Sequence, residues 1–167
     1  MYRVFKIYNG ATPTSAAVSK VSTGTTLKTM LQVAPTSTAN IRIVEWGISF
    51  DGSSAATPIQ VELVETSGAA TVTALASSDV VAVNDPGALG TQALTYSTTA
   101  TGHTASGEGT PSTSRLLDYQ LIAPTNQYVI QYPLGHEPLV QASKFLRVRV
   151  TAGTSVGAIC YVAWKEA

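Results

Sequence analysis

Many segments of this chain place apolar residues at every second position, and none keeps the period of 3.6 residues that an amphipathic helix needs. The segment KFLRVRVT shows the pattern clearly, because Leu146, Val148 and Val150 alternate with Arg147 and Arg149. Successive side chains of a β-strand point to opposite faces of a sheet, so we expect the arginines to point outward. The alternation restricts the chain to all-β folds.

Eight segments of this kind are separated by glycine, proline and other turn-forming residues. They are residues 26–33, 41–50, 59–65, 70–75, 113–122, 127–132, 144–151 and 157–164. In IRIVEWGISF the predicted inner face holds Val44, Trp46, Ile48 and Phe50. Arg42 lies on the same face, at the end of the strand that we expect to be exposed to solvent. About eight antiparallel strands predict a jelly-roll-like β-sandwich, and the sequence leaves the strand order open.

Two segments lie outside this predicted core. Residues 1–24 begin with YRVFKIY, which alternates like a strand, and continue with a stretch rich in alanine, serine and threonine. We expect either an extended N-terminal arm that pairs elsewhere, even on another subunit, or an edge strand of the same sandwich. Residues 76–112 are too long for an ordinary connection. We therefore expect one long loop inserted into a sandwich domain that spans residues 25–167.

Composition and charge exclude several classes of partner. Ten basic and ten acidic side chains give a formal net charge of zero. Without a basic excess there is no electrostatic attraction to nucleic acid or to an anionic membrane, so we expect neither as a partner. Charged residues are 12% of the chain, against a usual share of about 25%. Such a surface opposes self-association only weakly, so we expect an oligomer.

The sequence shows no targeting segment and no metal-binding pattern. The N-terminal region lacks the apolar stretch of a signal peptide, and no apolar run approaches the roughly 20 residues of a membrane-spanning helix, so we expect synthesis and folding in a cytoplasm. The single cysteine, Cys160, has apolar neighbours that predict a buried residue. Two separate histidines and one cysteine match no zinc spacing, so we expect no metal and no cofactor.

The stretch ATGHTASGEGTPSTSR contains the best candidate for a catalytic group. His103 could serve as a base for a nearby hydroxyl, with Glu108 or Asp118 to orient it. Hydroxyls are so frequent in this chain that a serine near a histidine is expected by chance. We therefore expect hydroxyl-rich loop material that leads into a strand, and no enzyme.

Other side chains have both a functional and a structural interpretation. Glu45, Glu62 and Glu65 lie on or beside predicted strands and could form a glycosidase pair, but pairing with outward arginines is far commoner. Trp46 and Trp164 could line a sugar-binding groove, but both alternate with apolar neighbours. We expect ion pairing for the glutamates and core packing for the tryptophans.

A series of segments resembles a known family. The segments are TLKTMLQVAPTSTANIRIVEWGISFDGS, VELVET, AATVTA, ATGHTASGEGT, SRLLDYQLIAPTNQYV, PLGHEP and KFLRVRVT, over roughly residues 25–165. In these segments the chain resembles small virion proteins of tailed phages. The resemblance implies a capsid decoration, or cement, protein that assembles as a homotrimer on the outer surface of the head. Such a protein is not an enzyme, and it stabilises the shell by bridging subunits of the major capsid protein.

The expected contact residues lie in two places. Tyr2, Phe5 and Tyr8 belong to the N-terminal strand, which could add to the open sheet edge of a neighbour. Tyr132 and His136 belong to the turn YPLGHEP. We expect these five residues to contact the capsid or another copy of the chain, and we expect the protein to be located in the virion.

Two other functions stay open. A minor tail or receptor-binding domain that recognises a host-surface glycan would expose aromatic residues on one face of the sandwich, with Tyr119, Tyr128 and Tyr132 as candidates. A glycan hydrolase or esterase built on a jelly roll would depend on His103 or Glu108. Capsid decoration is the function that we expect from the sequence.

Overall fold

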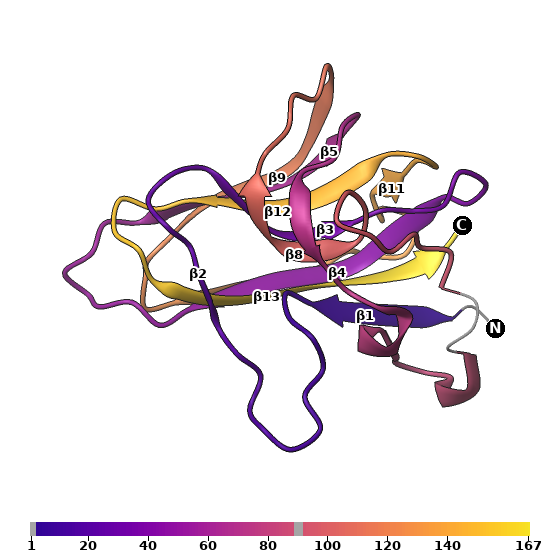
Figure 1. Cartoon of the computed structure of the whole chain (residues 1–167), viewed down its shortest axis with the longest axis horizontal. Helices are drawn as coiled ribbons and strands as arrows, with labels where there is room; N and C mark the ends of the chain where they lie inside the picture. Colours follow the sequence, from indigo (N-terminus) through magenta and orange to yellow (C-terminus); the bar gives the residue numbers. More distant parts are fainter. Residues whose placement is uncertain (1–2, 89–91) are drawn as a thin grey trace.

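Two antiparallel β-sheets pack face to face in the computed structural model, which describes residues 3–88 and 92–167 (Figure 1). The strands are β1 (Val4–Tyr8), β2 (Val21–Ser22), β3 (Lys28–Val33), β4 (Ile41–Phe50), β5 (Ile59–Thr66), β6 (Thr71–Ala74), β7 (Val81–Ala82), β8 (Gly102–Gly107), β9 (Ser114–Ile122), β10 (Gln127–Gln131), β11 (Leu139–Val140), β12 (Phe145–Thr151) and β13 (Gly157–Glu166), with 3₁₀ helices η1 (Ser77–Asp79) and η2 (Pro86–Ala88). Sheet A has the order β10-β4-β13-β1-β7, and sheet B has the order β6-β8-β3-β12-β5-β9. The short strands β11 and β2 pair with β4 and β13. The prediction of an all-β sandwich is confirmed.

Eight of these strands form the frame of a jelly roll. In chain order they are β1, β3, β4, β5, β9, β10, β12 and β13. Sheet A contains the first, eighth, third and sixth of them side by side, and sheet B contains the second, seventh, fourth and fifth. This is the strand order of a jelly roll, and the chain crosses between the sheets at every connection except that from β5 to β9. The expected jelly-roll-like sandwich is confirmed, and seven of the eight predicted strands belong to this frame. The segment 70–75 is instead β6 of the insertion, and the eighth frame strand is β1, which the sequence placed outside the core.

The connection from β5 to β9 contains the long segment that the sequence placed at 76–112. It is only partly a loop, because it carries the strands β7 and β8 and the helices η1 and η2. Together with β6, β8 extends sheet B beyond β3, and β7 extends sheet A beyond β1. The insertion thus covers one side of the sandwich, while β9 and β10 remain terminal strands on the other side.

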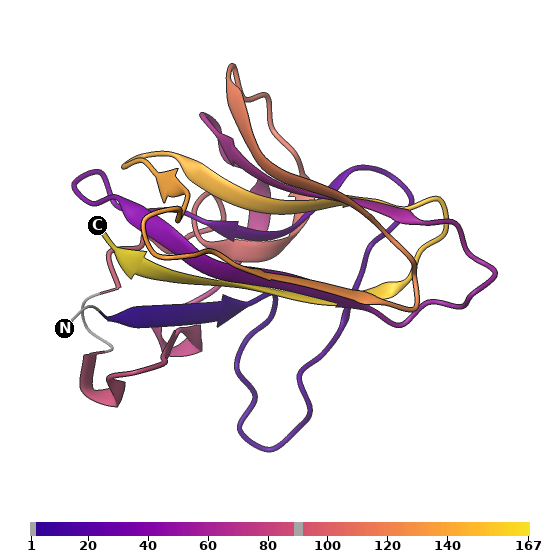
Figure 2. The ribbon, with the colours of Figure 1, turned by 180° about the vertical axis from the view of Figure 1, so that it is seen from behind.

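The N-terminal strand belongs to the sandwich of its own chain. β1 pairs with β13 along its whole length, with Phe5 opposite Trp164 and Tyr8 opposite Tyr161. β1 is therefore a strand of the same sandwich, which is one of the two alternatives that the sequence left open for residues 1–24. The residues that follow β1 do extend away from the sheets, as a loop that returns at β2 (Figures 1 and 2). Both termini lie at one end of the sandwich.

The core lies between the sheets and is built around two tryptophans. Trp46 on β4 and Trp164 on β13 are fully buried, as the sequence predicted. The ring centroids of Trp164 and Phe5 are 5.9 Å apart, and those of Trp46 and Tyr128 are 5.3 Å apart. Aromatic pairs at this separation add to the stability gained from burying their apolar surface. The rings therefore join β13 to β1 and β4 to β10.

A β-bulge in β4 changes which of its residues face the core. Glu45 lies opposite Ala163, but Ile43 lies opposite the next residue of β13, so Val44 is an extra residue in the pairing. An extra residue shifts the alternation by one position. As a result Ile43 is fully buried, whereas Arg42 and Val44 are only partly buried. The prediction that Val44 and Arg42 share the inner face with Trp46 is wrong.

A buried amide ties the insertion to the outer face of sheet B. Gln32 on β3 is fully buried although its side chain points away from the space between the sheets. Its Nε2 donates a hydrogen bond to the carbonyl oxygen of Ala100 at 2.6 Å, and its Oε1 accepts one from the N–H of Ala70 at 2.8 Å. A buried polar group is costly unless it is hydrogen-bonded. Gln32 therefore holds the covering segment at two points, just before β6 and just before β8.

A buried guanidinium does the same on the neighbouring strand. Arg147 on β12 points outward, as predicted, but its side chain is fully buried because the insertion covers it. Its Nη1 donates to the carbonyl oxygen of Glu108 at 2.9 Å and lies 3.4 Å from the carboxylate, and its Nη2 donates to the carbonyl oxygen of Gly68. The Glu108 carboxylate also accepts hydrogen bonds from the N–H and the hydroxyl of Thr29, both at 2.6 Å. Arg147 and Glu108 thus join the insertion to two strands of sheet B.

We expect Arg147→Ala to lower the free energy of unfolding by about 2–4 kcal/mol, because the carbonyl oxygens of Gly68 and Glu108 and the carboxylate of Glu108 all lose the fully buried guanidinium that binds them. Urea unfolding followed by tryptophan fluorescence measures this loss. Arg149 offers a matched control, because it lies on the same face of β12 but is partly exposed and pairs with Glu62 at 2.6 Å. Arg149→Ala should cost less, because among the described residues Arg149 binds the carboxylate of Glu62 and no backbone carbonyl oxygen. Equal losses in the two variants would contradict the role assigned to Arg147.

Candidate interaction surface

The exposed large apolar side chains of the described residues lie on or beside three strands and in three loops, and β9 carries the most. They are Val18, Leu27, Val81, Val83, Leu116, Tyr119, Leu121, Val129 and Leu134. Three of them lie on β9, where Leu116, Tyr119 and Leu121 are 57%, 47% and 64% exposed. Soluble monomers rarely expose a contiguous apolar patch without a partner, so this strand is a candidate contact surface.

We call Leu116, Tyr119 and Leu121 the β9 stripe. Tyr119 lies opposite Glu62 and Leu121 opposite Gln60 on the outward face of sheet B. A bulge in the pairing of β9 with β5 adds one residue to β9 and brings Leu116 to the same face. Because β9 is the terminal strand of sheet B, the stripe runs along an open edge of the sheet.

A hydrogen-bonded carboxylate connects β9 to β10 behind this stripe. Asp118 accepts hydrogen bonds from the Tyr128 hydroxyl at 2.9 Å, from Gln120 Nε2 at 2.9 Å and from the Tyr119 N–H at 2.8 Å. Burial, and then the bond to Asp118, raise the pKa of Tyr128 to about 12. The Tyr119 N–H is thus already satisfied at this open edge. A partner would therefore contact the stripe mainly through side chains.

The three predicted contact residues of the N-terminal strand differ in how the structure places them. Tyr2 lies outside the described residues. Phe5 is fully buried against Trp164, so its side chain is part of the core and is not available to a partner. Tyr8 is half-buried on sheet A, where its ring centroid lies 5.6 Å from that of Tyr161. Of the described pair, Tyr8 alone reaches the surface.

The other two predicted residues lie in a turn with a rigid base. Tyr132 is half-buried, His136 is exposed, and Leu134 between them is 75% exposed. The buried carboxylate of Glu137 accepts a hydrogen bond from Lys165 Nζ at 2.6 Å and another from a backbone N–H within the turn. The bond to Lys165 lowers the pKa of Glu137 to about 2. Beside the turn is a pocket of about 380 Å³, lined by side chains of the turn, β4 and β13.

The candidate catalytic residues do not converge. His103 lies on β8, so the strand begins inside the stretch that the sequence read as loop. Its Nδ1 lies 2.7 Å from Thr104 Oγ1, and burial lowers the pKa of its imidazole. Asp118 is four strands away across sheet B, a distance of about 19 Å at the usual strand spacing. Glu108 lies beyond the end of β8 and is bound to Arg147.

The three glutamates that the sequence singled out are engaged within the chain. Glu62 pairs with Arg149 at 2.6 Å, and Glu65 pairs with Arg115 at 3.0 Å. Glu45 accepts a hydrogen bond from a tyrosine hydroxyl at 2.5 Å. The predicted pairing of glutamates with outward arginines is therefore confirmed for Glu62 and Glu65.

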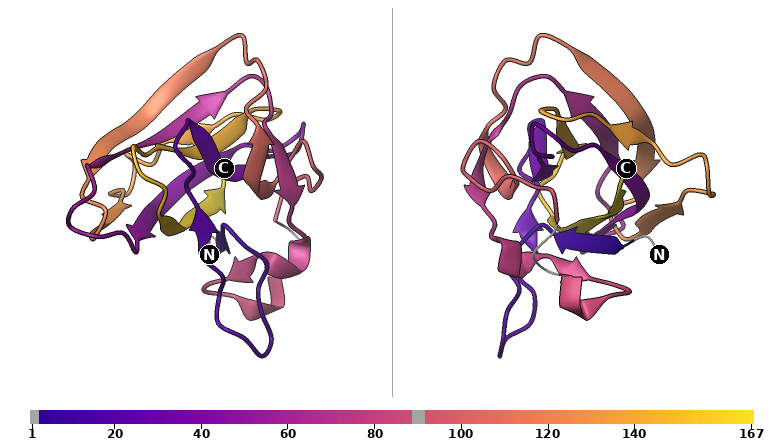
Figure 3. Two further views of the ribbon diagram at one scale, coloured as in Figure 1. Left: turned by 60° about the vertical axis from the view of Figure 1, so that its left-hand side comes forward. Right: turned by 90° about the vertical axis from the view of Figure 1, so that its right-hand side faces the viewer.

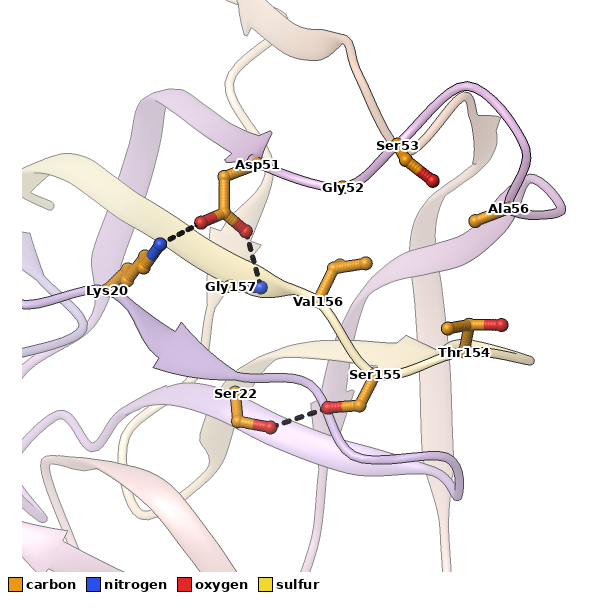
Figure 4. A pocket seen from close by; sticks show the side chains of 10 residues that line it. All are labelled: Lys20, Ser22, Asp51, Gly52, Ser53, Ala56, Thr154, Ser155, Val156 and Gly157. Carbon is orange, nitrogen blue, oxygen red and sulfur yellow. Dashed lines mark hydrogen bonds and ion pairs between the residues drawn. The ribbon is translucent and has the colours of Figure 1, made fainter.

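A polar pocket of about 520 Å³ lies between the segment at β2, the loop after β4 and the loop before β13 (Figure 4). In Figure 1 these two loops lie at the end of the sandwich opposite the C-terminus. Lys20 and Asp51 form an ion pair at its wall, and the N–H of Gly157 donates to Asp51 at 2.7 Å. The hydroxyls of Ser22 and Ser155 lie 2.7 Å apart. The bond to Lys20, followed by that from Gly157, lowers the pKa of Asp51. These polar groups bind one another and join the loops.

Three further observations concern metal binding, the single cysteine and membrane-spanning helices. Within the described ranges, no group of three or more His, Cys, Asp and Glu side chains is arranged to hold a metal ion. Cys160 is fully buried, and burial raises the pKa of its thiol. Over the same part of the chain, no helix has the length and apolar character needed to cross a membrane.

Sequence reasoning missed the outward apolar residues of β9 and β7. The segment 113–122 was expected as a strand, but only Tyr119 was singled out as a surface residue. A signal was present, because RLLDYQL has more large apolar residues than one buried face requires. Val81 and Val83 fell within the predicted loop, where no alternation was read.

We expect Glu137→Gln to destabilise the protein at pH 7, because the variant loses the charge that Lys165 stabilises. The folded-state pKa of about 2 lies below the ordinary value of 4.5. This stabilisation is therefore complete above about pH 4.5 and is lost as the pH falls towards 2. Urea unfolding at a series of pH values should show a difference between wild type and variant that shrinks below pH 4.5. A difference that does not change with pH would contradict this account.

No family model, curated protein or solved structure matches the chain. The chain combines a jelly roll with one side covered, an apolar stripe on an open edge, and a rigid turn that exposes Leu134.

Proposed function

We propose that this chain is a non-enzymatic decoration protein of a tailed-phage capsid, which binds the outer surface of the head and bridges subunits of the major capsid protein. The resemblance of the segments between about residues 25 and 165 supports this proposal. The observation that carries it is the placement of exposed apolar side chains on open strands and on one rigid turn. These positions suit contact with large neighbours better than enclosure of a small substrate.

The mechanism is association alone. Each copy would bury apolar surface against more than one capsid subunit, so opening of the shell would also require those contacts to break. A net charge of zero and a low charge content leave little long-range repulsion between neighbouring copies. Homotrimers fit this mechanism because three linked copies bind a lattice more tightly than one copy does.

The turn that contains Tyr132, Leu134 and His136 is the part that we assign to the capsid. Leu134 has the most exposed large apolar side chain of the described residues. The ion pair of Glu137 with Lys165 fixes the base of the turn, so little conformational entropy is lost when it docks. Leu134 would act as an apolar anchor, with His136 and Tyr132 beside it.

Binding of the purified protein to heads that lack it tests the proposal. We expect saturable binding by co-sedimentation, and a rise in the temperature at which the heads release DNA. Leu134→Asp should weaken binding by at least about tenfold, because it places a charge at the anchor. Leu27→Asp is a matched control, since Leu27 is an exposed leucine on another loop. No binding by the wild-type protein would refute the proposal.

The alternative of a tail or receptor-binding domain has a specific observation in its favour, which is the exposed ring of Tyr119. Electron microscopy of labelled particles separates the two functions. Label over the head surface supports decoration. Label at the tail tip, together with binding to a glycan array that is lost in Tyr119→Ala, would replace decoration with receptor binding.

A further inference from the structure

A pocket of about 330 Å³ lies where β9 begins and β5 ends. Its third wall is the segment between β11 and β12, which contributes Gln141 and Lys144. In both views of Figure 3, β9 (salmon) begins at the top of the molecule, with β5 beside it. The guanidinium of Arg115, near the start of β9, also donates to the carbonyl oxygen of Leu139 on β11. Residues that are distant in sequence are thus brought together at this end of β9.

A nearly buried carboxylate holds Arg115 in a fixed orientation at this pocket. The side chain of Glu65 is 9% exposed. Its two oxygens accept hydrogen bonds from Arg115 Nε at 3.2 Å and Nη2 at 3.0 Å, and one of them also accepts a bond from the N–H of Gln141 at 3.0 Å. A bidentate pair of this kind fixes the plane of the guanidinium. Among the described residues Arg115 Nη1 has no acceptor, so it can donate to another group.

Several other hydrogen-bond donors of the pocket lack a partner within the described ranges. The ammonium group of Lys144 makes neither a hydrogen bond nor an ion pair there. The hydroxyls of Thr113 and Ser114 likewise bind no other group. Glu65 is the one carboxylate among the described residues that line the pocket, and both of its oxygens are occupied. The pocket therefore offers donors without a matching set of acceptors.

The lining of this pocket also carries one positive charge that is not compensated. It contains two cations, Arg115 and Lys144, and a single carboxylate that is bound to Arg115. Asp118 does not line the pocket, and it lies three residues beyond Arg115 on β9, about 10 Å away in extended chain. In the larger pocket at β2, by contrast, Lys20 is paired with Asp51. Uncompensated positive charge together with unused donors favours an anionic ligand.

We propose that this pocket binds a tetrahedral oxyanion, phosphate or sulfate, either as the free ion or as a substituent on a sugar. Lys144 supplies the positive charge. Nη1 of Arg115 and the hydroxyls of Thr113 and Ser114 supply further hydrogen bonds to the anion. Hydrogen bonds to an ionised group are roughly twice as strong as those between neutral groups. The site is formed within one chain, so it does not depend on the proposed function.

The arrangement of the donors favours a tetrahedral anion over a planar carboxylate. Lys144 lies on the segment before β12, and the other donors lie at the start of β9. Donors on two separate segments reach an anion from more than one side, and the oxygens of phosphate or sulfate point in four directions. Arg115 is 49% exposed, so a ligand can reach the pocket and salt screens its charge. We therefore expect a dissociation constant on the order of millimolar at low ionic strength.

Titration of the isotope-labelled protein followed by ¹H–¹⁵N NMR tests this inference, with no capsid present. Sodium phosphate and sodium sulfate are added at constant ionic strength, with sodium chloride as the reference anion. We expect saturable shifts that are largest at the amides of residues 113–115 and 141–144. Glucose 6-phosphate and glucose separate the two sources of the anion. Tighter binding of glucose 6-phosphate than of phosphate assigns the pocket to a sugar substituent, and equal binding assigns it to the free ion.

Three variants test the residues of the site. Lys144→Gln removes the uncompensated charge and should weaken phosphate binding about fivefold or more, whereas Lys144→Arg keeps that charge and should bind like the wild type. Thr113→Val keeps the shape of the side chain without its hydroxyl and should weaken binding about threefold. Lys20→Gln is the matched control, because it removes the same charge from another pocket. Circular dichroism shows whether each variant keeps the fold.

Two results would overturn the inference. One is the absence of saturable shifts with phosphate and with sulfate in the wild-type protein. The other is equal binding by the wild type, Lys144→Gln and Lys20→Gln, since the anions would then be attracted without a specific site.

Discussion

The fully buried guanidinium of Arg147 binds the connection from β5 to β9, the longest of this jelly roll, to the outward face of sheet B. Arg147 binds carbonyl oxygens at both Gly68 and Glu108, and Gln32 holds the backbone between them on the adjacent strand. Because these bonds occupy the outward face of β3 and β12, the insertion becomes an additional layer and supplies strands to both sheets. The asymmetry of the molecule, with one side covered and the other open, depends on them.

That asymmetry explains where the apolar surface is found. On the covered side, the insertion ends sheet A with β7. On the open side β9 is the terminal strand of sheet B among the described residues, and Asp118 satisfies polar groups of β9 and β10. Natural sandwiches protect such edges with charges, bulges or covering segments. β9 contains a bulge, but two of its outward residues are the exposed leucines Leu116 and Leu121. Exposed leucines on a terminal strand are typical of a surface that binds a partner.

Alternation alone was sufficient to predict the sandwich and seven of its eight principal strands, because a residue buried on one face recurs at every second position. It failed in β4, where the pairing with β13 contains a bulge. Val44 in β4 reverses the phase, so the side chains before it were assigned to the wrong face. The burial of Arg147 could not be predicted from alternation either, because a segment distant in sequence covers this side chain. Phe5 was expected at a contact surface, since a strand that joins its own sheet and one that joins another chain have the same pattern.

The shared position of the two chain ends bears on how this molecule can be modified. Lys165, two residues from the C-terminus, holds the base of the turn that presents Leu134, so a passenger fused after Ala167 would emerge next to that turn. The loop between β4 and β5 lies at the far end of the sandwich (Figure 1). A peptide epitope or fluorophore inserted there would stand clear of the turn and of both chain ends, which makes that loop the better site for display.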